Sequence, residues 1–268
     1  MNVNLFFKEL RSSLKGSVII SLAVALYIAF SMSMYSMMSK NMATVTDLYS
    51  SIPESMRTAF NFYLNQWGNI LGFYITYFIY FVPIIVGCYS VVVGAKLLSK
   101  EEQNKTAEFL LSRPISRGRI VSSKILSFLV HILGINLFVF LVALISCGLN
   151  SKWDFRIQSL VILHTYGFLM CVLFGVLGFF MTVLMKRAKA SVGIGIGIVL
   201  GFYLFDMVIR VSGRLQFLLY LTPFKYLNLH ALAENYGFEA WRLGVFLGAS
   251  GLLIVLSFLF YRRKDILV

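Results

Sequence analysis

Charged side chains are scarce in this sequence, and acidic ones are the scarcest. Only 13% of the 268 residues are charged, and 11 acidic residues stand against 24 basic ones. A soluble domain of this size carries about a quarter charged residues. The apolar residues fall in runs of about 20, the length that crosses the hydrocarbon core of a bilayer. The chain is therefore predicted to be an integral membrane protein, which excludes a soluble domain.

Several chemical motifs are also missing. No GxxxxGK[ST] segment occurs, so any ATP that drives this protein must be bound by another chain. No HExxH occurs, and His131, His164 and His230 lie in three different regions, which leaves zinc protease chemistry without support. The three cysteines are dispersed in apolar runs, a spacing that suits neither a disulfide framework nor a metal site. We expect no catalytic, cofactor-binding or metal site in this chain.

The apolar runs predict an all-α polytopic membrane protein that forms one transmembrane permease-like domain over residues 1–268. Six spans are expected, at about 17–38, 69–95, 119–148, 157–185, 191–209 and 241–261. An even number of spans places both termini on the same side of the membrane.

Basic residues indicate which side that is. Of the 24 Lys and Arg residues, 16 lie in one set of segments, which comprises both ends of the chain, residues 96–124 and residues 186–189. The other 8 lie in the opposite set. An excess of Lys and Arg marks cytoplasmic segments. Both termini are therefore predicted to be cytoplasmic, and the positive charge is assigned to the membrane and not to nucleic acid.

The first 16 residues are amphipathic. In "NVNLFFKELRSSLK" a helix places Leu5, Phe6, Leu10 and Leu14 on one stripe, with the basic residues elsewhere. This pattern predicts a helix lying in the inner membrane interface. The alternative is a simple positively charged flank of the first span.

Two outer segments are predicted to hold short helices. In the first, Ser51 is a plausible N-cap, with Pro53 just inside the helix start. Its expected apolar face consists of Met56, Ala59, Phe60, Tyr63 and Trp67. The second, over 211–240, is apolar but too short to span. A re-entrant or interfacial hairpin that Pro223 breaks is expected there, before the last span.

Small residues recur four apart in three spans. This spacing lets helix backbones approach closely, within the chain or between two copies. The candidate residues for packing or dimerisation are Ser21, Ala25, Ala29, Gly193, Gly197 and Gly201, and Gly244 and Gly248 continue the pattern in the last span. The run "GIGIGIVLG" lacks the spacing and the preceding strand of a nucleotide-binding loop.

Two polar features of the spans carry open alternatives. Tyr74, Tyr77 and Tyr80 share one drifting helix face, which could line a route for an amphipathic substrate or pack and anchor the helix. Asp206 is the acidic residue deepest in a span. Intramembrane carboxylates are candidates for a functional role, but Arg210 stands four residues on and favours a structural ion pair.

The most charged stretch, "SKEEQNKTAEFLLSRPISRGRIVSSK" over 99–124, lies between the second and third predicted spans. Glu101 can pair with Lys105 within a short helix, Pro114 ends that helix, and Ser116 can cap the next one. An exposed Leu110–Leu111 pair favours a protein partner over a solvated loop.

This stretch resembles the cytoplasmic signature of permeases of the type-2 (ABC-2) exporter family of ABC transporters. The resemblance rests on an acidic pair, a Thr, a Glu, a double Leu, a Pro, a Ser-Arg and a Lys that opens the third span. The matching residues are Glu101, Glu102, Thr106, Glu108, Leu110, Leu111, Pro114, Ser116, Arg117 and Lys124. Lys105 departs from the glycine that the family commonly has before the Thr. The segments "IPESMRTAF" and "LTPFKYLN" also resemble the outer parts of that family.

The resemblance implies a permease that pairs with a second copy or a similar permease and sits on separate cytoplasmic ATPase subunits, which bind the ATP and Mg. Residues 99–118 would form the coupling segment. Within it, the expected ATPase contacts are Glu101, Glu102, Thr106, Glu108, Leu110, Leu111, Pro114 and Arg117, with the leucines as anchors and the glutamates as a charged rim. Such a protein is expected in the bacterial plasma membrane, in contact with its lipids.

The sequence leaves the cargo open. Aromatic residues make up 16% of the chain, and there are 11 methionines. These aromatic and methionine side chains suit an apolar, adaptable cavity and favour hydrophobic drugs or amphipathic, antimicrobial-type peptides as cargo. The competing hypothesis is a proton-coupled secondary transporter that uses Asp206, although no inverted repeat supports it.

Overall fold

The computed structural model describes residues 2–60, 62–103, 116–185, 188–227 and 239–263. Among these residues the regular structure is helical, without strands. Six helices are long and apolar enough to cross a membrane, which confirms the predicted fold class. They contain α1 (Val3–Ser33), α5 (Ile70–Gln103), α7 (Arg117–Ser151), α8 (Ile157–Leu184), α9 (Ala188–Ser212) and α12 (Ala240–Arg263).

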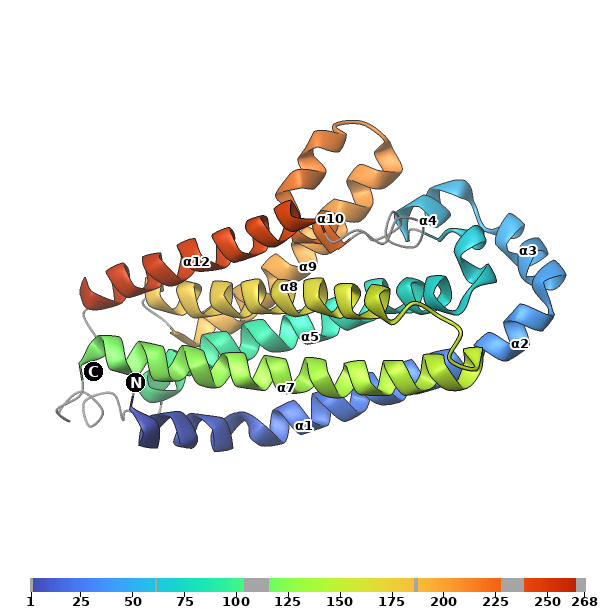
Figure 1. Ribbon diagram of the computed structural model, residues 1–268. Helices are drawn as coiled ribbons and strands as arrows, with labels where there is room; N and C mark the ends of the chain where they lie inside the picture. The colour runs from blue at the N-terminus through green and yellow to red at the C-terminus, as the bar shows by residue number, and fades with distance from the viewer. Residues whose placement is uncertain (1, 61, 104–115, 186–187, 228–238, 264–268) are drawn as a thin grey trace.

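The bundle has two distinct ends (Figure 1). At the basal end, α1 and α7 begin and α5 and α12 end. At the distal end, four short helices join α1 to α5: α2 (Tyr35–Lys40), α3 (Met42–Ser51), α4 (Glu54–Ala59) and the 3₁₀ helix η1 (Leu64–Gly68). Also there, α9 is followed by the 3₁₀ helix η2 (Gln216–Leu221) and α10 (Pro223–Leu227).

The centre of the bundle is the crossing of α5 and α8. Within the most apolar stretch of α8, 61% of the stretch is buried inside the protein, whereas the corresponding share for α12 is only 17%. At Gly94 an added Cβ would lie 1.9 Å from the carbonyl oxygen of Gly175, and at Gly178 it would lie 2.4 Å from that of Val91. The two backbones therefore touch, and only glycine permits this approach.

The sequence predicts an interfacial helix over 1–16 and a separate span that begins at residue 17. The structure shows no break between them. α1 is one continuous helix over 31 residues and packs along α7 (Figure 1). The predicted apolar stripe is divided, because Leu5 is buried whereas Leu14 is 53% exposed. The buried face of α1 instead runs through Leu5, Glu9 and Ser17. Polar contacts of this face with α5 and α7 hold the first turns against the bundle.

The first outer helix begins close to the predicted place, but its predicted cap is wrong. Ser51 is the last residue of α3, and its hydroxyl donates to the carbonyl of Leu48 at 2.6 Å. Pro53 disfavours a helical conformation at Ile52, which is extended, so α3 stops and α4 starts afresh at Glu54. The predicted apolar face from Met56 to Trp67 does not lie on one helix. α4 ends at Ala59, and Trp67 lies in the separate helix η1.

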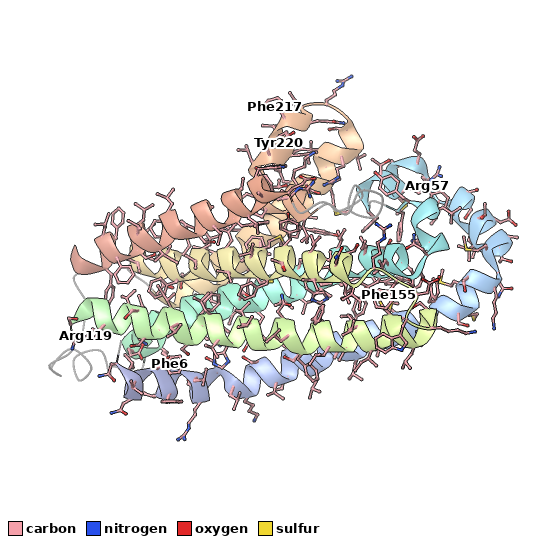
Figure 2. The ribbon with its side chains drawn as sticks, viewed as in Figure 1. Phe6, Arg57, Arg119, Phe155, Phe217 and Tyr220 are labelled. Carbon is pink, nitrogen blue, oxygen red and sulfur yellow. The ribbon has the colours of Figure 1, made fainter. Side chains whose placement is uncertain are left out.

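The second outer segment is folded as two short helices. η2 lies at the surface, with Phe217 and Tyr220 exposed (Figure 2). Pro223 is the first residue of α10, a position where its missing N–H has no cost, so the proline begins a helix as well as ending η2. Residues 228–238, in the second half of the predicted hairpin segment, lie outside the described residues.

Candidate functional site: a buried ion cluster at the basal end

Four charged side chains from three helices meet at the basal end, in what we call the basal ion cluster: Glu9, Lys100, Glu101 and Lys124. The ammonium of Lys124 donates to Glu9 Oε1 at 2.9 Å and to Glu101 Oε1 at 2.8 Å. It also donates to the carbonyl of Leu97. Lys100 donates to the other carboxylate oxygen of Glu9. The side chains of Glu9 and Lys124 are both completely buried.

The geometry satisfies Lys124 fully, because an ammonium has three donors and each has an acceptor. A buried ion costs several kcal/mol to desolvate, and this cost is offset only by good pairing. The cluster therefore requires α1, α5 and α7 to keep one arrangement. It lies where α5 ends at Gln103 and α7 begins at Arg117, on both sides of residues 104–115.

Backbone contacts extend this arrangement to the start of the chain. The backbone N–H of Asn2 donates to Ser123 Oγ at 2.7 Å, and Ser123 Oγ lies 3.2 Å from the Asn2 carbonyl. The side chain of Asn2 caps α1 by accepting from the N–H of Leu5. Ser116 caps α7 by accepting from the N–H of Arg119 at 3.4 Å, which confirms the predicted cap.

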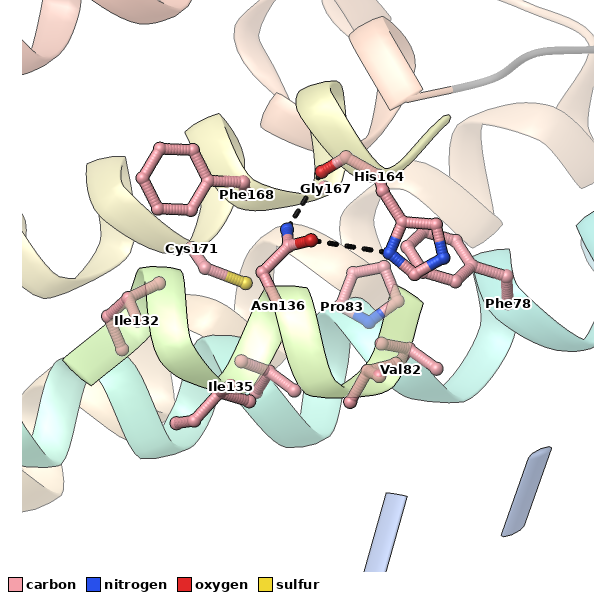
Figure 3. Close-up of a pocket in the computed structure, with 12 residues that line it drawn as sticks. Phe78, Val82, Pro83, Ile132, Ile135, Asn136, His164, Gly167, Phe168 and Cys171 are labelled. Carbon is pink, nitrogen blue, oxygen red and sulfur yellow. Dashed lines mark hydrogen bonds between the residues drawn. The ribbon is translucent and has the colours of Figure 1, made fainter. Parts of the chain in front are cut away.

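A second polar group lies inside the bundle, where α5, α7 and α8 meet (Figure 3). The Tyr74 hydroxyl is 2.8 Å from His164 Nε2, and Asn136 Oδ1 is 3.3 Å from His164 Nδ1. The Asn136 amide also donates to the His164 carbonyl at 2.8 Å. Because Asn136 Oδ1 only accepts, the ring proton is assigned to Nδ1, and Tyr74 then donates to Nε2. The group ties three spans together.

The cavity beside this group is small. It measures about 20 Å³, and Phe78, Pro83, Asn136 and His164 are among its lining residues. This is room for about one water molecule and not for a cargo. Tyr74, which the sequence placed on a possible substrate route, is therefore part of a packed interior in this structure.

Asp206 is held in an ion pair with Arg210, as the four-residue spacing suggested. Its Oδ2 accepts from Arg210 Nε at 2.6 Å, and its Oδ1 accepts from Arg210 Nη2 at 3.3 Å. Thr222 adds a hydrogen bond to Oδ1 at 2.9 Å. Both carboxylate oxygens thus have donors, and the contacts join the end of α9 to the turn before α10.

The family model described as "ABC-2 family transporter protein" matches residues 3–266, nearly the entire chain. The chain belongs to this family. No curated protein matches the sequence. The molecule is therefore an ABC-2 permease, a transmembrane subunit of an ABC transporter.

The predicted coupling residues of the ABC-2 permease are only partly described. Glu101 is 6% exposed and binds Lys124, so its predicted place on a charged rim is corrected: the cluster draws it inward. The partner that the sequence suggested for Glu101, Lys105, lies outside the described residues. The side chains of Glu102 and Arg117 are not described, and Thr106, Glu108, Leu110, Leu111 and Pro114 lie outside the described residues.

The remaining predicted residues of the permease were candidates either for helix packing and dimerisation or for the substrate path. Ser21 and Ala25 are covered within the chain, so they present no surface to a second copy, whereas Ala29 is exposed. Gly193, Gly197 and Gly201 are exposed on α9, and nothing lies within 4 Å of a Cβ added there. The Tyr77 carbonyl accepts from Tyr27, and the Tyr80 side chain is not described.

Neither the basal ion cluster nor the His164 group is predicted from the sequence. Lys124 enters the sequence prediction only as the residue that opens the third span, and Glu9 has no predicted role. The available signal for Glu9 was that it is the one acidic residue in the otherwise basic segment 2–15. For His164 it was a histidine in the middle of an apolar span, which is a candidate for a specific role.

Proposed function

We propose that this permease is the transmembrane half of an ATP-driven exporter, working as a pair of permeases on separate cytoplasmic ATPase subunits. The family match makes it an ABC transporter subunit. The observation that carries the rest of the proposal is the basal ion cluster. It anchors both helices that flank residues 104–115 to each other and to α1.

This anchoring suits the transmission of movement. A partner that displaces the coupling segment pulls on the end of α5 and the start of α7. Since Lys124 is paired with Glu9 and Glu101 in a fully buried site, separating the three helices would leave unpaired charges. Such a loss costs about 3–5 kcal/mol. The helices therefore move together, and α1 shares the displacement.

The orientation proposed for the chain puts the basal end in the cytoplasm. The sequence assigns 16 basic residues to the cytoplasmic segments against 8 to the opposite set, and α1 and α7, which begin at the basal end, carry Lys8, Arg11 and Arg119 of the larger set near their starts. An ATPase in the cytoplasm can then reach residues 99–118. A bacterial plasma membrane is the proposed location.

For pairing, α9 offers the better surface. Its stripe of three glycines is open, and Ile194, Leu200 and Leu204 beside it are 41–58% exposed. A second permease could approach this face closely. The stripe on α1 contributes less, since Ser21 and Ala25 are already covered.

The cargo proposed is a hydrophobic drug or an amphipathic peptide, carried along the surface between two permeases. The small cavity beside His164 favours a route between chains over one through a single bundle. The pairing of Asp206 with Arg210 and Thr222 supports a structural carboxylate, so it does not favour the proton-coupled alternative.

The test is copurification of the permease with a cytoplasmic ABC ATPase from its native host, followed by ATPase assays in lipid with a panel of hydrophobic drugs and amphipathic peptides. We expect a stable complex whose ATP hydrolysis is stimulated by some of these compounds. Transport that runs on a pH gradient without any ATPase would contradict the proposal.

A further inference from the structure

The exporter proposal makes no use of a groove between α1 and α5 at the basal end. Its volume is about 380 Å³, and it is lined by Ser12, Ser13, Tyr89, Val92, Lys96 and Lys100 among others. Ser12 and Lys96 are exposed, so the groove opens at the protein surface.

The groove changes character with depth. α5 runs from the distal to the basal end, so Lys96 and Lys100 lie nearer the membrane surface than Val92 and Tyr89. Lys96 and Tyr89 are seven residues apart, which is about two helical turns. The groove is therefore cationic at its mouth and apolar, with one hydroxyl, in its deeper part.

The hydroxyl of Tyr89 is fixed in the groove wall. It lies 3.0 Å from Ser17 Oγ, which in turn lies 3.0 Å from His131 Nδ1. The ring lies over Gly16, where an added Cβ would be 3.0 Å from the Tyr89 oxygen. A preformed polar position thus exists at the depth where a lipid carries its ester oxygens.

Charge at the mouth is not balanced. The basal ion cluster and Lys96 together hold three ammonium groups, on Lys96, Lys100 and Lys124, against the two carboxylates of Glu9 and Glu101. Lys100 bonds to Glu9 and lies 3.4 Å from Ser12 Oγ, whereas Lys96 has no ion-pair partner among the described residues. One positive charge remains, beside hydroxyl donors, for an external anion.

We propose that this groove binds one anionic phospholipid from the leaflet around the basal end. Lys96 and Ser12 hold its phosphate, Tyr89 contacts its ester region, and its acyl chains pass Val92. Basic pockets between membrane helices are suited to anionic headgroups. The lipid would stabilise α1 against α5, beside the basal ion cluster.

The experiment is native mass spectrometry of the purified full chain released from detergent micelles that contain either phosphatidylglycerol or phosphatidylcholine. The wild type should retain one phosphatidylglycerol in preference to phosphatidylcholine. Lys96→Gln should weaken this retention about fivefold, the effect of one lysine near an anionic lipid surface. Tyr89→Phe, which keeps the charge, should weaken it less.

Lys15→Gln is the matched control, because Lys15 is exposed on α1 and does not line the groove. It removes the same charge and should leave retention unchanged. Equal retention of the two lipids, or an equal loss in Lys15→Gln and Lys96→Gln, would overturn the proposal. So would displacement of the lipid by millimolar inorganic phosphate, which would indicate a site for the free ion. No ATPase enters the assay, so its outcome is independent of the exporter proposal.

Discussion

Buried ion pairs lie at opposite ends of the bundle, and they differ in how far apart their partners are in the sequence. At the distal end, Asp206 binds Arg210 four residues along the same helix. At the basal end, Lys124 binds Glu9 and Glu101, which are 115 and 23 residues away in the sequence. A carboxylate that binds within its own helix stabilises a local turn. One that binds another helix fixes how the helices sit, and a movement of one is passed to the others.

The largest effect is expected from Lys124→Met, which leaves two buried carboxylates without their shared cation. Breaking a buried pair in this way should cost about 3–5 kcal/mol. The midpoint of thermal unfolding in detergent should fall sharply, whereas Lys15→Met on the exposed face of α1 should hardly change it. Equal midpoints for the two variants would mean that the basal ion cluster does not hold the helices.

The next effect concerns docking of the ATPase to the proposed coupling segment. Leu110→Asp should weaken the complex by about 2 kcal/mol or more, the effect of losing a buried apolar anchor, and should abolish substrate-stimulated ATP hydrolysis. Glu102→Gln, a change of a proposed rim charge, should weaken it by only about a few tenths of a kcal/mol. Pull-down of the ATPase followed by hydrolysis assays in lipid measures both. Binding and stimulation like wild type in Leu110→Asp would remove this segment as the coupling element.

A smaller effect is expected at the distal pair. Asp206→Asn keeps the shape and loses the charge, and should lower stability by about 1 kcal/mol, as polar contacts in membranes do. Transport should remain coupled to ATP, because the pair lies within one helix and far from the basal end. If transport is driven by pH before this change and independent of pH after it, Asp206 is a proton carrier.

The smallest effect on the stability of the single chain is expected from Gly197→Leu, since nothing lies within 4 Å of this position. The change should leave the unfolding midpoint near that of wild type but weaken pairing of permeases, which cross-linking in lipid can measure. Gly94→Ala is the contrasting variant, because its Cβ would meet the Gly175 backbone. This overpacking should destabilise the single chain by about 1–3 kcal/mol and so lower its unfolding midpoint. Unchanged pairing in Gly197→Leu would contradict the proposed α9 interface.

Features that depend on neighbours in the sequence were predictable. Six apolar runs gave six spans, because the length of a run decides whether it can cross the hydrocarbon. The Ser116 cap was expected from a serine shortly after Pro114 and before the next helix, and the Asp206–Arg210 pair from a spacing of four residues, which a helix brings together whatever surrounds it.

Only the tertiary structure decided which side chains face inward. Glu101 binds Lys124 from another helix, 23 residues along the chain, and no spacing within one helix indicates this pair. The glycines with the regular spacing, Gly193 and Gly197, are open, whereas Gly94 and Gly178 form the close crossing. Spacing along one helix states which residues share a face, but not which face another helix covers. That choice depends on contacts between residues far apart in the chain, such as Glu9 with Lys124. No local sequence pattern identifies such pairs.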